Sequence, residues 1–380
     1  MAFDLASSNL ELARINIAKS QRYINGLNLA KGNLAIVFNV PKGGSNPQYG
    51  FINKNGDVVI GYKYDDAAPF DYTGFASVKR INLSDSGNKK WEETTYLIDT
   101  SGREYPSAHI IGDLRSGITA LDLRDEVLEE YPSEMFSHPQ LKILLLQGDL
   151  QTVITLPAEI QKMKSLECFS SLGYVFDSIP AQIGQLDNLR SLIISYGRLK
   201  SLPAEIKNLE KLQSLELSGN SMTAFPEGIV SLIQLRSLNL ASNSLDKLPG
   251  QIGDLVNLQK LDLQWNRLTS LPPQIAHLKN LQFLNLDKNR FEQLPPEIGQ
   301  LKSLQDLVLT GNPLRSFPMQ ILPLTNLESL DLSSNKLLKT IPTEITQLKN
   351  LRTLKLTDTA IPVSDQARIR NLLPWCYIIF

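Results

Sequence analysis

The side chains best suited to catalysis or metal binding are few in this 380-residue chain and lie far apart in the sequence. No histidine has a cysteine or carboxylate partner at the spacing of a metal site. A catalytic thiol would also need a nearby base, and the sequence indicates none. The residues considered are His109, His138, His277, Cys168 and Cys376. The sequence therefore predicts no catalytic residue, no metal and no cofactor.

The charge balance also excludes several classes of partner. There are 38 Lys and Arg residues against 39 Asp and Glu, a net charge of −1, so nucleic acid or an anionic membrane is not expected as a partner. Two cysteines cannot form a disulfide framework, which favours a reducing compartment. No signal peptide or roughly 18-residue apolar span is present. We expect a cytoplasmic protein without membrane insertion, with secretion by a signal-independent route left open.

The elements that must position any site follow from an internal repeat. Prolines recur every 23 residues, at Pro157, Pro180, Pro203, Pro226, Pro249, Pro272, Pro295 and Pro318. Each unit reads LxxLxLxxNxLxxLPxxIxxL, as in residues 258–278. Alternating leucines place one side of a short strand in a core, and stacked units form a parallel sheet. Each proline ends the strand segment and suits the start of a short helix.

An asparagine column accompanies the leucines. Its side-chain amides can bond the backbone of neighbouring turns and so satisfy buried polar groups. The column consists of Asn220, Asn243, Asn266, Asn289, Asn312 and Asn335. We expect an α/β solenoid with a parallel sheet on the concave face and short helices or 3-10 turns on the convex face.

This pattern resembles the intracellular-type, 23-residue leucine-rich-repeat proteins common in bacteria. About eleven units begin at Ile118, Leu141, Leu166, Leu189, Leu212, Leu235, Leu258, Leu281, Leu304, Leu327 and Leu351. Four units depart at the asparagine position, with Glu126, Asp149, Tyr174 and Gly197. The resemblance implies a solenoid over residues 117–362. Residues 363–380 are predicted to cap it, with a helix over 364–374 starting at Ser364 or Asp365, and with Trp375, Cys376 and Ile378 in the cap core.

Residues 1–110 have a different composition, with short alternating runs and few leucines. A helix is expected over 5–24, and strands within 32–38, 49–70, 74–80 and 95–106, with turns at Asn55-Gly56 and Ser101-Gly102. The segment 49–70 resembles the bacterial WG-type (KWG) β-repeat, although Tyr49-Gly50 stands where that family has Trp-Gly. The resemblance implies a small β-rich domain.

A partner would meet the outward positions of the concave strands. Trp265 and Phe283 belong to adjacent repeats and are expected to lie close together, ringed by charge as in interface hot spots. The predicted partner-binding residues are Trp265, Phe283, Tyr196, Lys260, Asp262, Asn285, Asp287 and Lys288. A second candidate is the apolar patch of Leu145, Leu172, Ile193 and Tyr196, which the N-terminal domain could cover instead.

The sequence thus predicts a monomeric, non-catalytic interaction module that binds a protein partner on the concave face of the solenoid. Two alternatives stay open. One is a secreted or surface-associated repeat protein, and the other is an enzyme whose site lies within residues 1–110. A nucleic-acid role is not expected, because the concave columns mix both signs of charge without a basic stripe.

Overall fold

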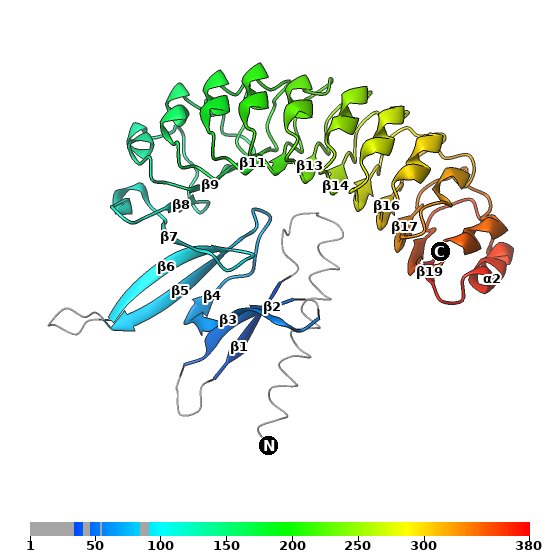
Figure 1. Ribbon diagram of the computed structural model, residues 1–380, viewed down its shortest axis with the longest axis horizontal. Helices are drawn as coiled ribbons and strands as arrows, with labels where there is room; N and C mark the ends of the chain where they lie inside the picture. Colours follow the sequence, from blue (N-terminus) through cyan, green and yellow to red (C-terminus); the bar gives the residue numbers. More distant parts are fainter. Residues whose placement is uncertain (1–33, 41–45, 54, 84–90) are drawn as a thin grey trace. The chain divides into compact units, whose positions relative to one another are not determined.

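The computed structural model describes residues 34–40, 46–53, 55–83 and 91–380, which form two compact units (Figure 1). The first unit comprises the described residues up to Leu123 together with Gln140–Leu145. The second comprises Arg124–Pro139 together with Leu146–Phe380. The helix predicted over 5–24 lies outside the described residues. Strand β8 (Ala120–Leu123), which the repeat pattern assigns to the first repeat, belongs to the first unit.

The remaining strands of the first unit confirm the predicted β-rich region. They are β1 (Ala35–Asn39), β2 (Gln48–Ile52), β3 (Val58–Tyr64), β4 (Asp66–Ala67), β5 (Phe75–Leu83), β6 (Trp91–Asp99) and β7 (Glu104–Ala108). Strands β1, β2 and β3 form one antiparallel sheet. Strands β4 to β7 pair antiparallel in sequence order, and β7 pairs with β8 in parallel.

The two predicted turns of this unit share one local design. The side chain of Asn53 accepts hydrogen bonds from the backbone N–H groups of Asn55 and Asp57, and Asp99 does the same for Ser101 and Arg103. Such side chains replace the backbone acceptor of a turn. The glycines at 56 and 102 have φ of 91° and 82°, which only glycine adopts without strain. The Asn-Gly and Ser-Gly signals therefore mark real chain reversals.

A partly buried ion cluster lies beside the apolar core of the first unit. Tyr64 is fully buried, and its hydroxyl donates to Oε1 of Glu104 at 2.8 Å. Nζ of Lys63 lies 2.7 Å from the same oxygen, and the Arg80 guanidinium also donates to it. The pKa of Glu104 lies below its ordinary value. Burial alone would raise this pKa, but the hydrogen bonds from Lys63 and Tyr64 and the charge of Arg80 together lower it by more. One carboxylate thus joins strands β3, β5 and β7.

The solenoid strands stack as the repeat predicts (Figure 1). They are β9 (Ile143–Gln147), β10 (Cys168–Leu172), β11 (Ser191–Ser195), β12 (Ser214–Glu216), β13 (Ser237–Asn239), β14 (Lys260–Asp262), β15 (Phe283–Asn285), β16 (Asp306–Val308), β17 (Ser329–Asp331), β18 (Thr353–Lys355) and β19 (Tyr377–Ile379). From β10 to β19 each strand pairs in parallel with the next. Equivalent residues of successive repeats are therefore direct neighbours.

Short 3-10 turns return the chain on the convex side. They span Ser133–Ser137, Ala158–Lys162, Ala181–Gln185, Ala204–Asn208, Glu227–Ser231, Gly250–Asp254, Pro273–His277, Pro296–Gln300, Met319–Ile321 and Thr343–Gln347; a further turn, Ile111–Asp113, precedes the repeats. The repeat proline stands directly before most of these turns in an extended conformation, as Pro272 does with φ −67° and ψ 149°. The proline thus ends the extended segment and stands outside the turn itself.

The asparagine column binds one repeat to the next. Nδ2 of Asn289 donates to the carbonyl oxygens of Leu263 (2.8 Å), Leu286 and Asp287 (both 3.2 Å), and Oδ1 accepts from the N–H of Leu268 at 3.0 Å. The other five asparagines repeat this arrangement. Buried backbone groups that the short strands leave without partners are satisfied in this way.

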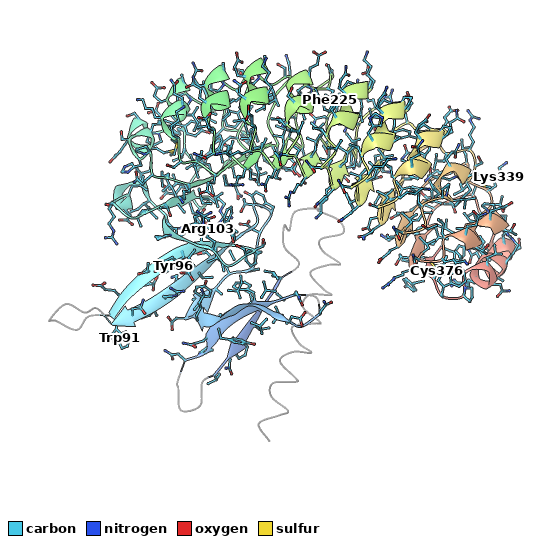
Figure 2. The ribbon with its side chains drawn as sticks, in the orientation of Figure 1. Trp91, Tyr96, Arg103, Phe225, Lys339 and Cys376 are labelled. Atoms are coloured by element: carbon cyan, nitrogen blue, oxygen red, sulfur yellow. The ribbon has the colours of Figure 1, made fainter. Side chains whose placement is uncertain are left out.

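The C-terminal cap differs in detail from the prediction. Helix α2 spans Val363–Leu372 and follows Pro362, so neither Ser364 nor Asp365 acts as its N-cap. Pro362 directly precedes the helix, and its fixed φ suits the helix start without a side-chain cap. Trp375 is 50% exposed and is not part of the cap core, whereas Ile378 on β19 is buried. Cys376 is partly buried in the cap, where Figure 2 labels it.

Candidate functional site

From the third repeat onward, one residue of each repeat has a left-handed backbone conformation one to three positions after the strand. We call these residues the left-handed column: Gly173, Tyr196, Gly219, Ser242, Trp265, Lys288, Gly311, Ser334 and Asp358. Their φ angles lie between 50° and 75°, and each stands one position before the asparagine column or its equivalent. Backbone N–H groups along the column donate to the next repeat, as Trp265 does to the Asp287 carbonyl at 2.8 Å. The hydrogen-bonded ladder therefore fixes this conformation.

Large side chains at this column have no structural justification. A left-handed conformation costs about 1–2 kcal/mol for a residue with a Cβ, and bulky residues rarely adopt it. Apart from Lys288, the other repeats use glycine, serine or aspartate at the same turn. Yet Tyr196 and Trp265 stand there with 39% and 56% of their surface exposed. Strain combined with exposure is typical of residues kept for function.

The best-defined group on this column is the Trp265 cluster, formed by Trp265, Asp287 and Lys288. Nζ of Lys288 lies 5.8 Å from the centre of the Trp265 ring, within the range of a cation–π contact. The following column position is Gly311, where a Cβ would lie 2.7 Å from Cδ of Lys288. The missing side chain of this glycine leaves room for the lysine. Trp265 and Lys288, both among the residues predicted to bind a partner, thus lie together.

Asp287 carries an incompletely satisfied carboxylate. Its Oδ1 is buried and finds no hydrogen-bond partner among the described residues, and the same holds for Oγ1 of Thr310 on the next repeat. Burial raises the pKa of Asp287 to about 6; Lys288 opposes the shift, and repulsion from Asp331 and Asp262 adds to it. The concave surface at this point therefore holds more negative charge than it neutralises.

Asp287→Asn is expected to raise the free energy of unfolding at pH 7.5 by about 1 kcal/mol, after allowance for solvent screening. The folded-state pKa of Asp287 lies above its ordinary value of 3.8, so the folded state holds this proton more tightly. Stability due to this group falls as the pH rises from about 4 to about 6. Urea unfolding at pH 7.5 and pH 4 measures it. An equal gain at both pH values would contradict the assignment.

Phe283 does not form the predicted aromatic pair with Trp265. Phe283 stands at the start of β15, in register with Lys260 and Asp306 of the flanking strands. Trp265 is in register with Lys288, five residues further along the strand direction, which corresponds to roughly 15 Å. The expectation that the two rings lie close together was wrong because adjacent repeats are neighbours only at equivalent positions.

Asp262 and Asn285 occupy the predicted concave positions but are buried, with only 4% and 5% of their surface exposed. Oδ1 of each accepts the N–H of the residue two positions on, Gln264 and Asp287. Nδ2 of Asn285 also donates to Oδ2 of Asp262 at 3.2 Å. Asn239 and Asp331 make the same local bond. These short polar side chains thus bond the backbone where the strand ends. The sequence analysis assigned them to the exposed face from their outward positions and missed this structural role.

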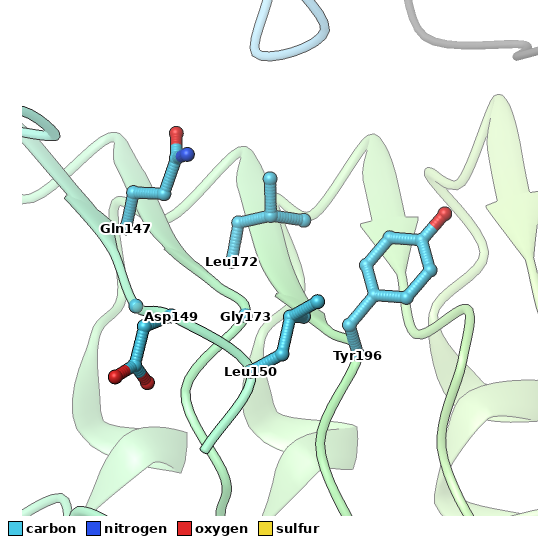
Figure 3. A pocket seen from close by; sticks show the side chains of 7 residues that line it. Gln147, Asp149, Leu150, Leu172, Gly173 and Tyr196 are labelled. Atoms are coloured by element: carbon cyan, nitrogen blue, oxygen red, sulfur yellow. The ribbon is translucent and has the colours of Figure 1, made fainter. Parts of the chain in front are cut away.

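The second predicted patch is exposed only in part. Leu145 and Ile193 are fully buried and belong to the core. Leu172 and Tyr196 instead line a pocket of about 340 Å³ together with Leu150, Gly173 and Gln147 (Figure 3). The sequence analysis missed Leu150, because its repeat is two residues longer than the regular interval of 23 and departs from the pattern at Asp149.

The chemistry of the described residues offers little else. Cys168 is buried. Within the part of the chain that the structure describes, no three of His, Cys, Asp and Glu lie close enough together to hold a metal ion. In that same part, no helix has the length and apolar character needed to cross a membrane.

Family comparisons agree with this architecture. A model described as a leucine-rich repeat region matches residues 227–312, and one described as a leucine rich repeat matches residues 187–245 and 302–361. A model described as a WG containing repeat matches residues 49–82. A search of curated proteins finds no match to the chain.

Solved structures with the same repeat come from several organisms. The Listeria monocytogenes internalin InlF is 19% identical, covers 74% of this chain and 84% of its own, and has a TM-score of 0.55. The ectodomain of the Arabidopsis thaliana receptor kinase GASSHO1/SCHENGEN3, solved in complex with Casparian strip integrity factor 2, is 24% identical with a TM-score of 0.55. It covers 79% of this chain and 39% of its own. These two similarities show the fold alone.

A leucine-rich-repeat protein of Leptospira interrogans is similar in sequence. It is 31% identical, and the match covers 70% of this chain and 90% of that protein, with a TM-score of 0.40. Together with the family models, this level of identity over nearly the whole of a relative identifies the solenoid. The chain belongs to the leucine-rich-repeat family and carries a WG-containing repeat in its N-terminal unit.

Proposed function

We propose that this protein binds a protein partner on the concave face of its solenoid and does so without catalysis. The observation that carries the proposal is Trp265, a large aromatic side chain that is 56% exposed in a strained left-handed conformation. Nothing in the fold requires it, because other repeats use glycine or serine there. An exposed tryptophan beside charged groups is typical of an interface hot spot.

The family supports a binding role. Leucine-rich-repeat proteins typically mediate protein–protein interaction, and the Arabidopsis receptor ectodomain with the same fold was solved in complex with Casparian strip integrity factor 2. A solenoid presents a preformed surface, so little ordering entropy opposes association. The fold alone does not specify a function, because one scaffold serves many functions. The proposal therefore depends on the Trp265 cluster and includes the remaining predicted residues Phe283, Lys260 and Tyr196 as secondary contacts.

Trp265→Gly is expected to weaken partner binding at least tenfold while leaving the fold intact. Glycine adopts φ of 52° without strain, so the substitution relieves the backbone as it removes the ring. The immobilised wild-type protein and the variant would each be used for affinity capture from a lysate of the source organism, with quantitative mass spectrometry of the captured proteins.

Ser242→Gly supplies the matched control, because Ser242 has the same φ of 52° one repeat earlier and a small side chain. It is expected to capture the same proteins as the wild type. Circular dichroism establishes that all three proteins are folded. Equal capture by the Trp265→Gly variant would show that Trp265 is not part of the binding site, and this proposal would then be wrong.

We further propose that the protein is monomeric and meets its partner in the cytoplasm. The presence of only two cysteines supports a reducing compartment, as the sequence indicates. Fractionation of the source cells and sedimentation of the purified chain test the two statements separately. Recovery of the chain outside cells would favour the secreted alternative instead.

A further inference from the structure

Positively charged side chains border Trp265 at the turn that follows its strand. We call them the basic rim: Arg267, Lys288 and Arg290, all three exposed. Lys288 follows Trp265 in the left-handed column, and each arginine stands two positions after a residue of that column. The basic rim therefore belongs to the same two repeats as the Trp265 cluster.

Backbone hydrogen bonds hold the two arginines at equivalent positions of adjacent repeats. The N–H of Arg267 donates to the Leu245 carbonyl at 2.8 Å, and the N–H of Arg290 donates to the Leu268 carbonyl at 2.8 Å. The repeats thus keep the spacing of neighbouring strands at this point, about 4.8 Å. Two guanidinium groups at that spacing can both reach one carboxylate, or two successive carboxylates of one segment.

The arginines of the basic rim are free to bind. Neither Arg267 nor Arg290 forms a salt bridge or a side-chain hydrogen bond with any residue that the structure describes. Nζ of Lys288 lies over the Trp265 ring, which is still 56% exposed. A partner would therefore meet uncommitted guanidinium donors beside an accessible aromatic surface.

Acidic side chains lie near the basic rim without neutralising it. Asp287 stands on the strand side of Lys288 and has one oxygen buried. Glu292 binds Arg315 at 2.9 Å. Asp246, exposed on the preceding turn, makes no salt bridge with a described residue. Negative charge is thus concentrated at the strands, and positive charge at the turn edge beside Trp265.

The repeat itself does not require arginine at this position. The flanking repeats have uncharged residues there, namely Ser221, Ser244 and Pro313. Arginine instead accompanies a large residue of the left-handed column, in the pairs Tyr196 with Arg198, Trp265 with Arg267 and Lys288 with Arg290. The cations therefore go with the exposed side chains and not with the solenoid architecture.

We propose that the turn edge at Trp265 binds an acidic segment of the protein partner, in which aspartate or glutamate adjoins a large apolar side chain. The carboxylate binds the guanidinium groups of Arg267 and Arg290 through charge-assisted hydrogen bonds. The apolar side chain packs on the exposed part of the Trp265 ring, as at an interface hot spot. Lys288 adds positive potential that favours the encounter. This inference rests on the proposed function and specifies the chemistry of the partner.

The test is a selection from a phage-displayed library of random dodecapeptides on the full-length protein. The wild type is expected to enrich peptides in which an acidic residue adjoins a large apolar one, about tenfold or more over the unselected library. The Arg267→Gln/Arg290→Gln variant is expected not to enrich them. Arg198→Gln is the matched control, because Arg198 has the same position three repeats earlier, and it is expected to enrich them as the wild type does.

Fluorescence polarisation with a synthetic enriched peptide then measures the contact itself. Arg267→Gln is expected to weaken binding about tenfold, and so is replacement of the acidic residues of the peptide by their amides. The two changes together are expected to cost little more than either alone, because they remove the same contact. Additive losses would mean that the acidic residues of the peptide bind elsewhere, and the inference would then be wrong.

Three results of the selection would overturn the inference. They are enrichment of peptides without acidic residues, equal enrichment on the arginine variant, and no enrichment at all. Affinity capture separates this failure from failure of the proposed function. If Trp265→Gly loses the cellular partner but Arg267→Gln/Arg290→Gln retains it, protein binding at Trp265 stands and the acidic segment is wrong. If neither variant loses the partner, both proposals fall.

Discussion

Asn289→Ala is expected to lower the free energy of unfolding by about 3 kcal/mol, because each buried polar group left without a partner costs about 1–3 kcal/mol. The amide of Asn289 makes hydrogen bonds to three carbonyl oxygens and one N–H from two repeats. Alanine satisfies none of these groups, and the site is too deep for water to replace them freely. Urea unfolding followed by circular dichroism measures the loss.

Asn280→Ala is the matched control on the convex side of the neighbouring repeat. Its Nδ2 makes one hydrogen bond, to the carbonyl of Val256 at 2.9 Å, and the bond is exposed to solvent. Water can take its place, so the expected loss is below about 1 kcal/mol. Similar losses for the two variants would mean that the asparagine column does not hold the repeats together.

Glu104→Ala is expected to destabilise the first unit by about 2–3 kcal/mol. The substitution leaves the buried hydroxyl of Tyr64 without its acceptor and Arg80 without its counterion. The estimate is below that for a fully buried pair because the side chains of Arg80 and Glu104 retain 26% and 21% exposure. Hydrogen exchange followed by mass spectrometry is expected to show lost protection in β3, β5 and β7 and unchanged protection in β14 to β17.

The pH dependence of this effect has a defined sign. The pKa of Glu104 is lowered in the folded state, so its stabilising effect is complete above the ordinary value of 4.5 and is lost as the pH falls through the folded-state pKa. The Glu93→Ala variant removes an exposed partner of Lys79 in the same unit and is expected to cost less than about 0.5 kcal/mol. Loss of protection spread evenly over both units would contradict the local role of Glu104.

Periodicity predicted the solenoid because each repeat must bury the same apolar side. The leucines, the asparagine column and the proline positions therefore follow from the 23-residue interval alone. The Asn-Gly and Ser-Gly turns of the first unit were equally predictable, because few other sequences adopt positive φ without strain.

The candidate site was less predictable, for physical reasons that differ from residue to residue. The separation of Phe283 from Trp265 depends on strand register, which becomes clear only when equivalent positions are aligned. The burial of Asp262 and Asn285 depends on bonds to their own strand that polar composition does not reveal. Leu150 was missed because its repeat is two residues longer than the regular interval of 23, so this residue has no equivalent in the other repeats. A pocket is a property of three repeats together, and no single repeat encodes it.

The glycines that follow large residues in the left-handed column restrict how densely the concave face can present recognition groups. Tyr196 leans over Gly219 and Lys288 over Gly311, so a side chain at either glycine would collide with its neighbour. Two large groups consequently occur on adjacent repeats only where the second can lie over the first, as Lys288 does over Trp265. Any attempt to redesign the specificity of this surface must therefore exchange residues in pairs, moving each bulky side chain together with the glycine that accommodates it.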